Sequence, residues 1–248
     1  MRLYIATFDQ NWDTLGPIVE NYHTGVEVQR FCGHAALDDP DAALSEIDRH
    51  LPRDNRSMHG YFYSMNPAAY DPLIRDATLC RYRQSYAVGR RFGTERIVFH
   101  TGFTFPFPPD RYTYENFNAF WGTFLKDVDD DIEFHIENMF EKKWEYLRDF
   151  VAAADDTRVS ACLDIGHVNA CSSQSHAEWI RGLTNTIRYI HLHNNFGETD
   201  EHNGLGKGSI PMREVLDLLM THAPDAIWTI ENGEIEQSIQ WLVGNGYL

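Results

Sequence analysis

Histidine or acidic residues stand at the ends of several apolar segments of this chain. The pattern occurs at residues 57–59, 97–100, 134–137, 162–167 and 190–193, and a last segment ends at Glu231. In a parallel α/β barrel the carboxyl ends of all strands meet at one rim, where the chemistry of such proteins is found. Side chains able to hold a metal ion would therefore be gathered from distant parts of the chain.

The spacing of apolar and turn-forming residues predicts eight strands with helices between them. The strands are expected at residues 3–8, 25–31, 57–62, 96–102, 132–138, 160–167, 187–195 and 227–232. Helical spacing is found at 41–51, 79–92, 114–127, 143–154, 175–183, 211–221 and 234–243. Eight such repeats in 248 residues fit one α/β domain, a (β/α)8 TIM barrel over residues 1–248, better than an open sheet.

Charge and cysteine content narrow the classes of partner. The formal net charge of −16 disfavours nucleic acid, because a protein that binds a polyanion usually carries a basic surface. The four cysteines form no C-x-x-C pair, the first residues already have strand character, and no apolar run approaches membrane-spanning length. We therefore expect a cytoplasmic protein without membrane contact, and the sequence does not define its oligomeric state.

Strand parity predicts which side chains point into the barrel. Glu133, His135 and Glu137 alternate with the apolar Phe134 and Ile136, which suit the surrounding helices. The same alternation along the strands at 160–167, 187–195 and 227–232 predicts that eight more side chains point into the barrel. They are Ser160, Cys162, Asp164, Tyr189, His191, His193, Thr229 and Glu231. Such a polar interior is unfavourable unless its groups are paired or bind an ion, so a metal centre is expected at the carboxyl ends of the strands.

The candidate ligands are five histidines and four acids. They are His59, His100, His167, His191, His202, Glu137, Asp164, Asp200 and Glu231. Imidazole and carboxylate groups without a thiolate suit zinc, manganese or iron rather than a structural zinc knot.

The motifs around these ligands resemble those of the AP endonuclease family 2 (endonuclease IV type), within the xylose isomerase-like barrel superfamily. Residues 96–102 (RIVFHTG) resemble the family's strand that ends in H-P-G, 136–138 its I-E-N, 162–167 its C-x-D-x-x-H, and 200–208 its D-R-H…L-G-E-G. Residues 191–194 (HLHN) resemble its H-L-N-D but differ at the third and fourth positions. The resemblance extends from about residue 57 to residue 231.

The resemblance implies up to three zinc ions and hydrolysis of a phosphoester by a metal-bridged hydroxide. The first ion would be held by His59, His100 and Glu137, the second by Glu137, Asp164, His191 and Glu231, and the third by His167, Asp200 and His202. Glu137 and Glu231 would be the catalytic carboxylates. The substrate would be abasic DNA or a smaller phosphoester.

The alternative is a sugar or sugar phosphate isomerase or epimerase of the same superfamily. One manganese-like ion would then lie among Glu137, Asp164, His191 and Glu231, the two glutamates would transfer the proton, and His167 would bind substrate. Such an enzyme does not need metal at His59, His100 or His202.

Three further residues are expected to contact substrate. His191 and His193 share a face, so either could be the ligand; the resemblance favours His191 and leaves His193 for the substrate. Tyr61, in an aromatic run after His59, is a stacking candidate that loop packing would also explain. Lys207, where the family has glutamate, could bind a phosphate.

Overall fold

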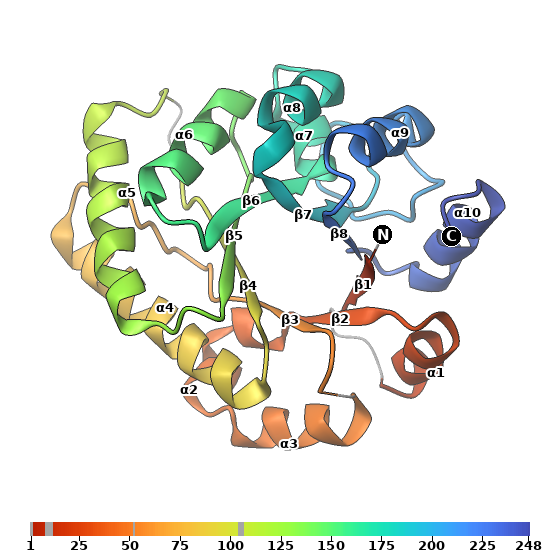
Figure 1. The fold of residues 1–248 in the computed structure, drawn as a ribbon, viewed down its shortest axis with the longest axis horizontal. Coiled ribbons are helices and arrows are strands. Elements are labelled where there is room, and N and C mark those ends of the chain that lie inside the picture. The colour runs from red at the N-terminus through yellow and green to blue at the C-terminus, as the bar shows by residue number, and fades with distance from the viewer. Residues whose placement is uncertain (1, 8–11, 52, 104–106) are drawn as a thin grey trace.

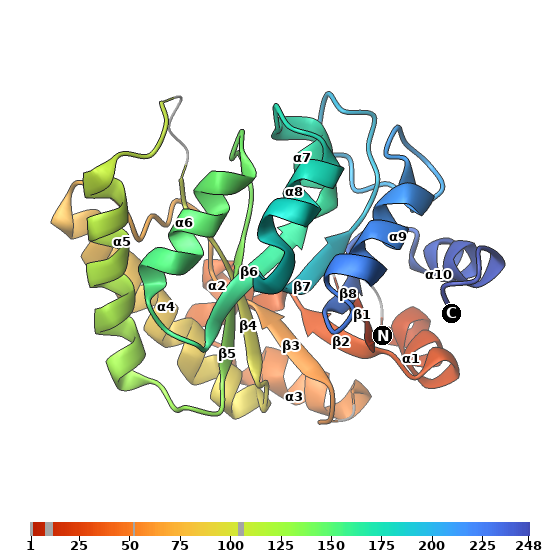
Figure 2. The ribbon, with the colours of Figure 1, turned by 45° about the horizontal axis from the view of Figure 1, so that its top comes forward.

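Eight parallel strands close into a barrel surrounded by helices, which confirms the predicted TIM barrel (Figures 1 and 2). The computed structural model describes residues 2–7, 12–51, 53–103 and 107–248. The strands are β1 (Arg2–Ala6), β2 (Gly25–Val28), β3 (Arg56–His59), β4 (Arg96–His100), β5 (Glu133–Glu137), β6 (Val159–Asp164), β7 (Ile187–Leu192) and β8 (Ile227–Ile230). Each strand pairs with the next in the chain, and β8 pairs with β1.

The helices follow the strands around the ring in chain order (Figure 1). They are α1 (Trp12–Tyr22), α2 (His34–Asp38), α3 (Asp41–His50), α4 (Pro72–Phe92), α5 (Arg111–Phe124), α6 (Trp144–Ala154), α7 (Ile165–Cys171), α8 (His176–Leu183), α9 (Met212–His222) and α10 (Ile235–Gly244). Short 3-10 turns lie at Arg30–Cys32, Leu125–Asp127 and Thr184–Thr186. None of the described helices is long and apolar enough to cross a membrane.

Most strands end earlier than the sequence predicted. β6 stops at Asp164 rather than at residue 167, because the Asp164 carboxylate accepts the backbone N–H of His167 at 2.6 Å and caps α7. His167 is therefore on the first turn of a helix and not on a strand. One prediction lies partly outside the described residues: the end of the strand at 3–8.

The two faces of the strands pack as parity predicted. Phe134 is fully buried among aromatic side chains of the helical layer, such as Trp121 and Phe124. Burying a side chain of this size contributes about 1.5–3 kcal/mol. Inside the barrel, a separate apolar cluster comprises Tyr4, Val98, Cys162, Tyr189 and Ile227.

His135 points inward, as parity predicted, and contacts Ser160 and Tyr189. Its Nδ1 lies 2.8 Å from Ser160 Oγ, and its ring stacks on Tyr189 with centroids 4.9 Å apart. The strongest effect on this ring is burial, which lowers the pKa of His135 to about 3 and keeps it neutral. The polar interior below the ligands is thus partly satisfied by pairs among its own members.

Glycine at position 60 allows the chain to leave β3 directly above a neighbouring strand. A Cβ at Gly60 would lie 2.1 Å from the ring of Phe99, which stacks on Tyr82 at 3.7 Å. Only glycine permits this approach without moving the ring. The backbone there also sets the position of His59, whose Nδ1 lies 2.9 Å from the carbonyl oxygen of Gly60.

Candidate metal centre

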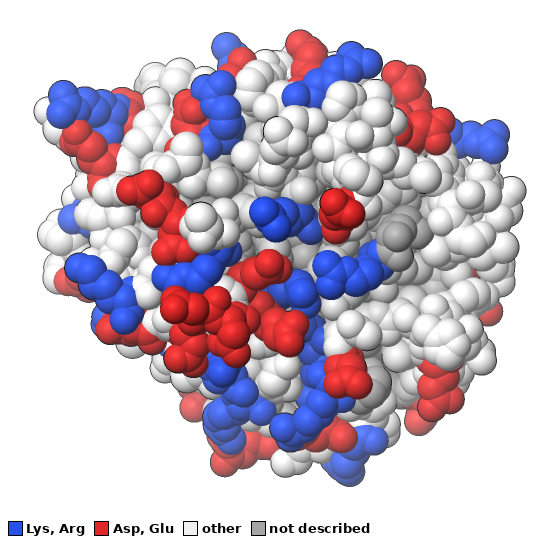
Figure 3. Space-filling view, viewed as in Figure 1, with Lys and Arg blue, Asp and Glu red and all other residues white. Residues whose placement is uncertain are grey.

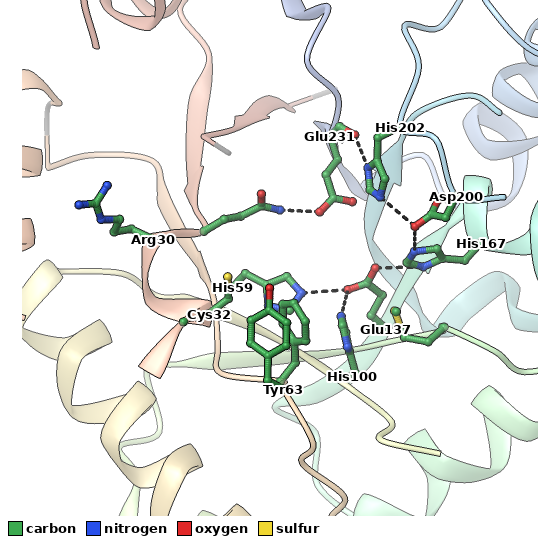
Figure 4. Close-up of a pocket in the computed structure, with 14 residues that line it drawn as sticks. Arg30, Cys32, His59, Tyr63, His100, Glu137, His167, Asp200, His202 and Glu231 are labelled. Atoms are coloured by element: carbon green, nitrogen blue, oxygen red, sulfur yellow. Dashed lines mark hydrogen bonds and ion pairs between the residues drawn. The ribbon is translucent and has the colours of Figure 1, made fainter. Parts of the chain in front are cut away.

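A pocket of about 420 Å³ opens at the carboxyl ends of the strands (Figure 4). Seven of the nine predicted ligands line it: His59, His100, Glu137, His167, Asp200, His202 and Glu231. The other two, Asp164 and His191, are fully buried beneath them. The structure therefore brings together all nine residues, which come from strands β3 to β7, the first turn of α7, the loop after β7 and the end of β8.

Glu137, the last residue of β5, lies at the centre of the site. Its Oε2 is 3.2 Å from Nε2 of both His59 and His100, and its Oε1 is 3.0 Å from His191 Nδ1 and 3.4 Å from His167 Nδ1. Burial alone would raise its pKa, but the neighbouring His191 and His100 hold the pKa of Glu137 well below its usual value. The carboxylate is therefore charged and shared by two groups of ligands.

The first group consists of Glu137, His59 and His100, whose ligand atoms lie within 4.8 Å of one another. Burial is the main effect on His100, and it lowers the pKa of that ring to about 4 despite the nearby Glu137 carboxylate. A neutral imidazole with a free lone pair is the form that binds a metal ion.

The second group lies deeper in the barrel and consists of Glu137, Asp164, His191 and Glu231. His191 Nδ1 is 3.1 Å from Glu231 Oε2 and 3.8 Å from Asp164 Oδ2, in addition to its contact with Glu137. Three carboxylates thus converge on one ring nitrogen.

A buried glutamate that the sequence analysis missed holds the other side of the His191 ring. His191 Nε2 lies 3.0 Å from Oε2 of Glu27, which is completely buried in β2. Gln29 links this glutamate to the ligands, because its Nε2 donates to Glu27 Oε1 at 3.3 Å and to Glu231 Oε1 at 2.5 Å. An acid in the otherwise apolar strand Gly25–Val28 was a signal that could have revealed it.

The third group consists of His167, His193, Asp200 and His202 and forms around Asp200, in the loop after β7. Asp200 Oδ2 is 3.0 Å from His167 Nε2 and 2.9 Å from His202 Nε2. Burial opposes a charged ring, but the hydrogen bond to Asp200 and the nearby carboxylates raise the pKa of His202 to about 9. The same causes raise the pKa of His167 well above its ordinary value.

The hydrogen bonds of His167 and His202 are compatible with a bound metal ion. Nδ1 of His167 donates to the carbonyl of Asn138 and Nδ1 of His202 to that of Glu231, each at 2.8 Å. In the neutral ring, Nε2 then carries a lone pair that faces the Asp200 carboxylate. Two acceptors facing each other require a proton or a cation between them, and bound metals commonly fix histidine in this way.

Glu231 supplies a second indication of fit. Its Oε2 is buried and forms no hydrogen bond with the described residues, although His191 Nδ1 lies 3.1 Å away. A buried carboxylate oxygen without a donor is costly unless it is protonated or bound to an ion. Burial in fact raises the pKa of Glu231.

The three residues predicted to contact substrate lie outside the pocket lining. His193 is fully buried. Tyr61 is 9 % exposed, with the guanidinium of Arg81 over its ring at 5.0 Å, so it serves loop packing. Lys207 pairs with Glu234 at 3.2 Å. None of the three is part of the lining of this pocket, and their contact with substrate stays a prediction.

The two aromatic residues that follow Tyr61 in the sequence line the pocket. They are Phe62 and Tyr63, and the Phe62 ring lies 4.5 Å from that of His100. Arg30 also lines the pocket, but its guanidinium points away from the ligand cluster (Figure 4).

Several arginines at the surface of the barrel are paired with aspartates. The ion pairs are Arg81–Asp38, Arg83–Asp127, Arg90–Asp131 and Arg91–Asp41. On the face seen in Figure 3, basic side chains are interspersed with acidic ones and form no continuous basic surface. That nucleic acid is disfavoured stays a prediction from the net charge.

Comparison with known proteins identifies the family. A family model described as xylose isomerase-like TIM barrel matches residues 23–243, which is most of the chain. The chain belongs to the xylose isomerase-like TIM barrel family. The uncharacterised protein MJ1311 of Methanocaldococcus jannaschii is 28 % identical over 196 residues, covering 74 % of this chain and 66 % of that relative. The chain thus matches just under two thirds of the length of this relative.

Solved structures with the same xylose isomerase-like fold are more distant in sequence. A D-tagatose 3-epimerase-like protein has a TM-score of 0.78 and 22 % identity, covering 100 % of this chain and 97 % of its own. The TTHB071 protein of Thermus thermophilus, soaked with ZnCl2, has a TM-score of 0.80 and 22 % identity over 98 % and 97 %. D-psicose 3-epimerase in the presence of D-fructose has a TM-score of 0.68 and 19 % identity over 97 % and 89 %.

These comparisons place the chain in a fold family that contains enzymes. The names of the similar structures are mostly those of sugar epimerases, and they fit the isomerase alternative better than the hydrolase. At identities of 22 % and below they show the fold, so the choice of reaction depends on the residues of the site.

Proposed function

We propose that this chain is a divalent-metal-dependent phosphoester hydrolase. The observation that carries the proposal is the convergence of ligand-type side chains at Glu137 and Asp200. Among the described residues, Glu137 belongs to three groups, with His59 and His100, with Cys162 and His191, and with Asp164, His191 and Glu231, and a fourth group consists of His167, His193, Asp200 and His202. A single-metal isomerase would use only the group of Glu137, Asp164, His191 and Glu231. It would have no need for ligand-type histidines at positions 59, 100 and 202.

The proposal assigns up to three ions to the three groups, with zinc as the ion that fits this donor set best. When bound, such ions lower the pKa of water and neutralise the charge of a phosphate group. The specific ion remains part of the proposal.

The chain's own residues would hold the reacting groups. Glu137 keeps the first two groups together because each of its oxygens faces two histidines. Glu231 lines the pocket, and its Oε2 forms no hydrogen bond with the described residues. This oxygen lies 3.1 Å from His191 Nδ1, so it would be the atom that Glu231 offers to an ion in the second group. The Gln29 amide fixes the other oxygen.

A small phosphoester fits the site better than DNA does. The pocket of about 420 Å³ has the size of a small-molecule site. The net charge is −16, and arginines near the helical surface are neutralised by aspartates. An extended polyanion would meet repulsion that a single phosphate at a metal cluster would not.

Sugar isomerisation or epimerisation is the second candidate, and the similar solved structures favour it. One ion would then be held by Glu137, Asp164, His191 and Glu231. The two glutamates would remove and return a proton on the sugar carbon, and His167 would bind the substrate.

Metal content separates the two candidates. Elemental analysis of tag-free protein would be made on the wild type, His100→Ala and His202→Ala, with the exposed His34→Ala as a matched control. Close to three ions per chain, reduced in the first two variants only, supports the hydrolase. One ion, unchanged by either substitution, overturns it.

Activity assays then follow the metal analysis. The loaded protein would be tested on p-nitrophenyl phosphate, bis(p-nitrophenyl) phosphate and an abasic-site oligonucleotide, and on D-fructose with Mn²⁺. Hydrolysis of a small ester that disappears in His100→Ala is the expected result. Epimerisation of D-fructose without hydrolysis would favour the second candidate.

A further inference from the structure

His193 lies beneath the pocket, close enough to His167, Asp200 and His202 to count as a possible member of the third ligand group, and it also contacts Asp164 of the second. Its Nε2 is 3.1 Å from both carboxylate oxygens of Asp164 and 3.6 Å from Asp200 Oδ1. Its ring stacks on that of His202, with centroids 3.9 Å apart and an interplanar angle of 13°. The side chain is fully buried, so it touches the cluster and not the pocket.

The environment of the ring decides which nitrogen carries the proton. Nδ1 is buried without a hydrogen-bond partner among the described residues. A donor left unpaired there would be costly, whereas Nε2 faces a carboxylate acceptor. The neutral ring therefore has its proton on Nε2 and donates it to Asp164. A nitrogen that donates to Asp164 has no lone pair for a metal ion.

This hydrogen bond restricts how Asp164 can act as a ligand. Oδ1 of Asp164 also accepts the backbone N–H of His167 at 2.6 Å. Oδ2 is the less occupied oxygen, and it lies on the side of His191 Nδ1, 3.8 Å away. The two donors thus fix the carboxylate so that one oxygen remains for the second ligand group.

Gly166 provides the space in which the His193 ring lies. A Cβ at Gly166 would be 1.8 Å from Cε1 and 2.3 Å from Nδ1 of that ring. Gly166 is in the first turn of α7, between Asp164 and His167, both of them predicted ligands. Any side chain at this position would push the ring away from Asp164 and His202.

We propose that His193 is a positioning residue that ties the second and third metal groups together, with Gly166 as the position that admits its ring. It orients Asp164 through Nε2–H and supports His202 by stacking. The inference rests on metal occupancy in the proposed function, but it holds for a hydrolase and for an isomerase alike.

The first experiment separates the hydrogen bond from mere packing. His193→Gln keeps an N–H donor, whereas His193→Leu keeps bulk and removes the donor. Metal affinity would be measured by chelator competition, ion content by elemental analysis, and ligand geometry by the absorption spectrum of the Co²⁺-loaded protein. Loss of a partner of this kind typically weakens metal binding about 10- to 100-fold. We expect this loss in His193→Leu, with a changed Co²⁺ spectrum, and substantial rescue in His193→Gln.

The second experiment uses the contact between Gly166 and the His193 ring. Gly166→Ala alone should weaken metal binding by a similar factor, because it displaces the ring. In a His193→Ala background the added methyl group has room, so Gly166→Ala should cause no further loss. Such non-additivity is expected for residues that act through one contact.

The outcomes distinguish the inference from the function on which it rests. Wild-type affinity and an unchanged Co²⁺ spectrum in His193→Leu would overturn the inference alone. Complete loss of one ion in both His193 variants would also overturn it, since that result would make the residue a ligand. A wild-type protein that binds no divalent ion would instead refute the proposed function.

Discussion

Replacing Glu137 by glutamine should remove two metal groups at once and destabilise the metal-free protein. Glutamine has nearly the same volume but no charge. In the structure, the Glu137 oxygens face nitrogens of His59, His100, His191 and His167 at 3.0–3.4 Å. Removing the charged partner from a buried network costs about 3–5 kcal/mol. For a chain of this size that corresponds to a fall of roughly 6–20 °C in the unfolding midpoint.

The assay combines thermal unfolding with elemental analysis, and it has a matched control. Glu141→Gln changes another buried carboxylate, which accepts hydrogen bonds from Thr101 and the backbone of Met139 and belongs to none of the ligand groups found among the described residues. We expect Glu137→Gln to retain only the ion of His167, Asp200 and His202, while Glu141→Gln keeps the wild-type content. If Glu137→Gln binds the wild-type number of ions, the shared role of this carboxylate is refuted.

Three further predictions concern stability. Gly60→Ala places a methyl group 2.1 Å from the Phe99 ring and should lower the free energy of unfolding, measured by chemical denaturation, by about 1–3 kcal/mol. Gly122→Ala, in a helix and with open space around it, should raise that free energy by about 0.5–1 kcal/mol. Equal effects of the two substitutions would contradict the packing argument. Hydrogen bonds from Arg158 lower the pKa of Asp156 in the folded protein. The free energy of unfolding of Asp156→Asn should therefore be about 1 kcal/mol lower than that of the wild type at pH 7. This difference should vanish as the pH falls from about 4 through the folded pKa of Asp156. A difference that persists below that range would refute the assignment. Zn²⁺ at a hundredfold excess over its Kd should raise the free energy of unfolding by about 2.7 kcal/mol per site, reversed by EDTA; unchanged melting curves would exclude tight binding.

The ligand set could be predicted because barrel topology converts sequence order into spatial proximity. Strands that alternate with helices must be parallel, so the residues after each strand meet at one rim. The inward position of Glu137 and Asp164 followed from parity, and the structure places both there. That they bind metal stays a prediction.

The residues that support the ligands could not be predicted in the same way. Glu27 is on a strand whose end carries no histidine, and its contact with His191 spans 164 residues of the chain. Sequence parity also could not distinguish His193 from a substrate contact, because it gives the direction of a side chain but not what lies above it. In the structure the ring of His202 stacks on that of His193.

The sequence by itself determined the barrel, the rim at which chemistry occurs and the residue types gathered there, because these depend on periodicity of 2 and 3.6 and on the direction of parallel strands. Tertiary structure alone decided how the polar groups pair. Whether Nε2 of His193 meets Asp164 or the solvent depends on contacts between β6, α7 and β7 that no local pattern encodes. Buried polar groups must satisfy one another at distances of about 3 Å, and only the folded chain sets those distances.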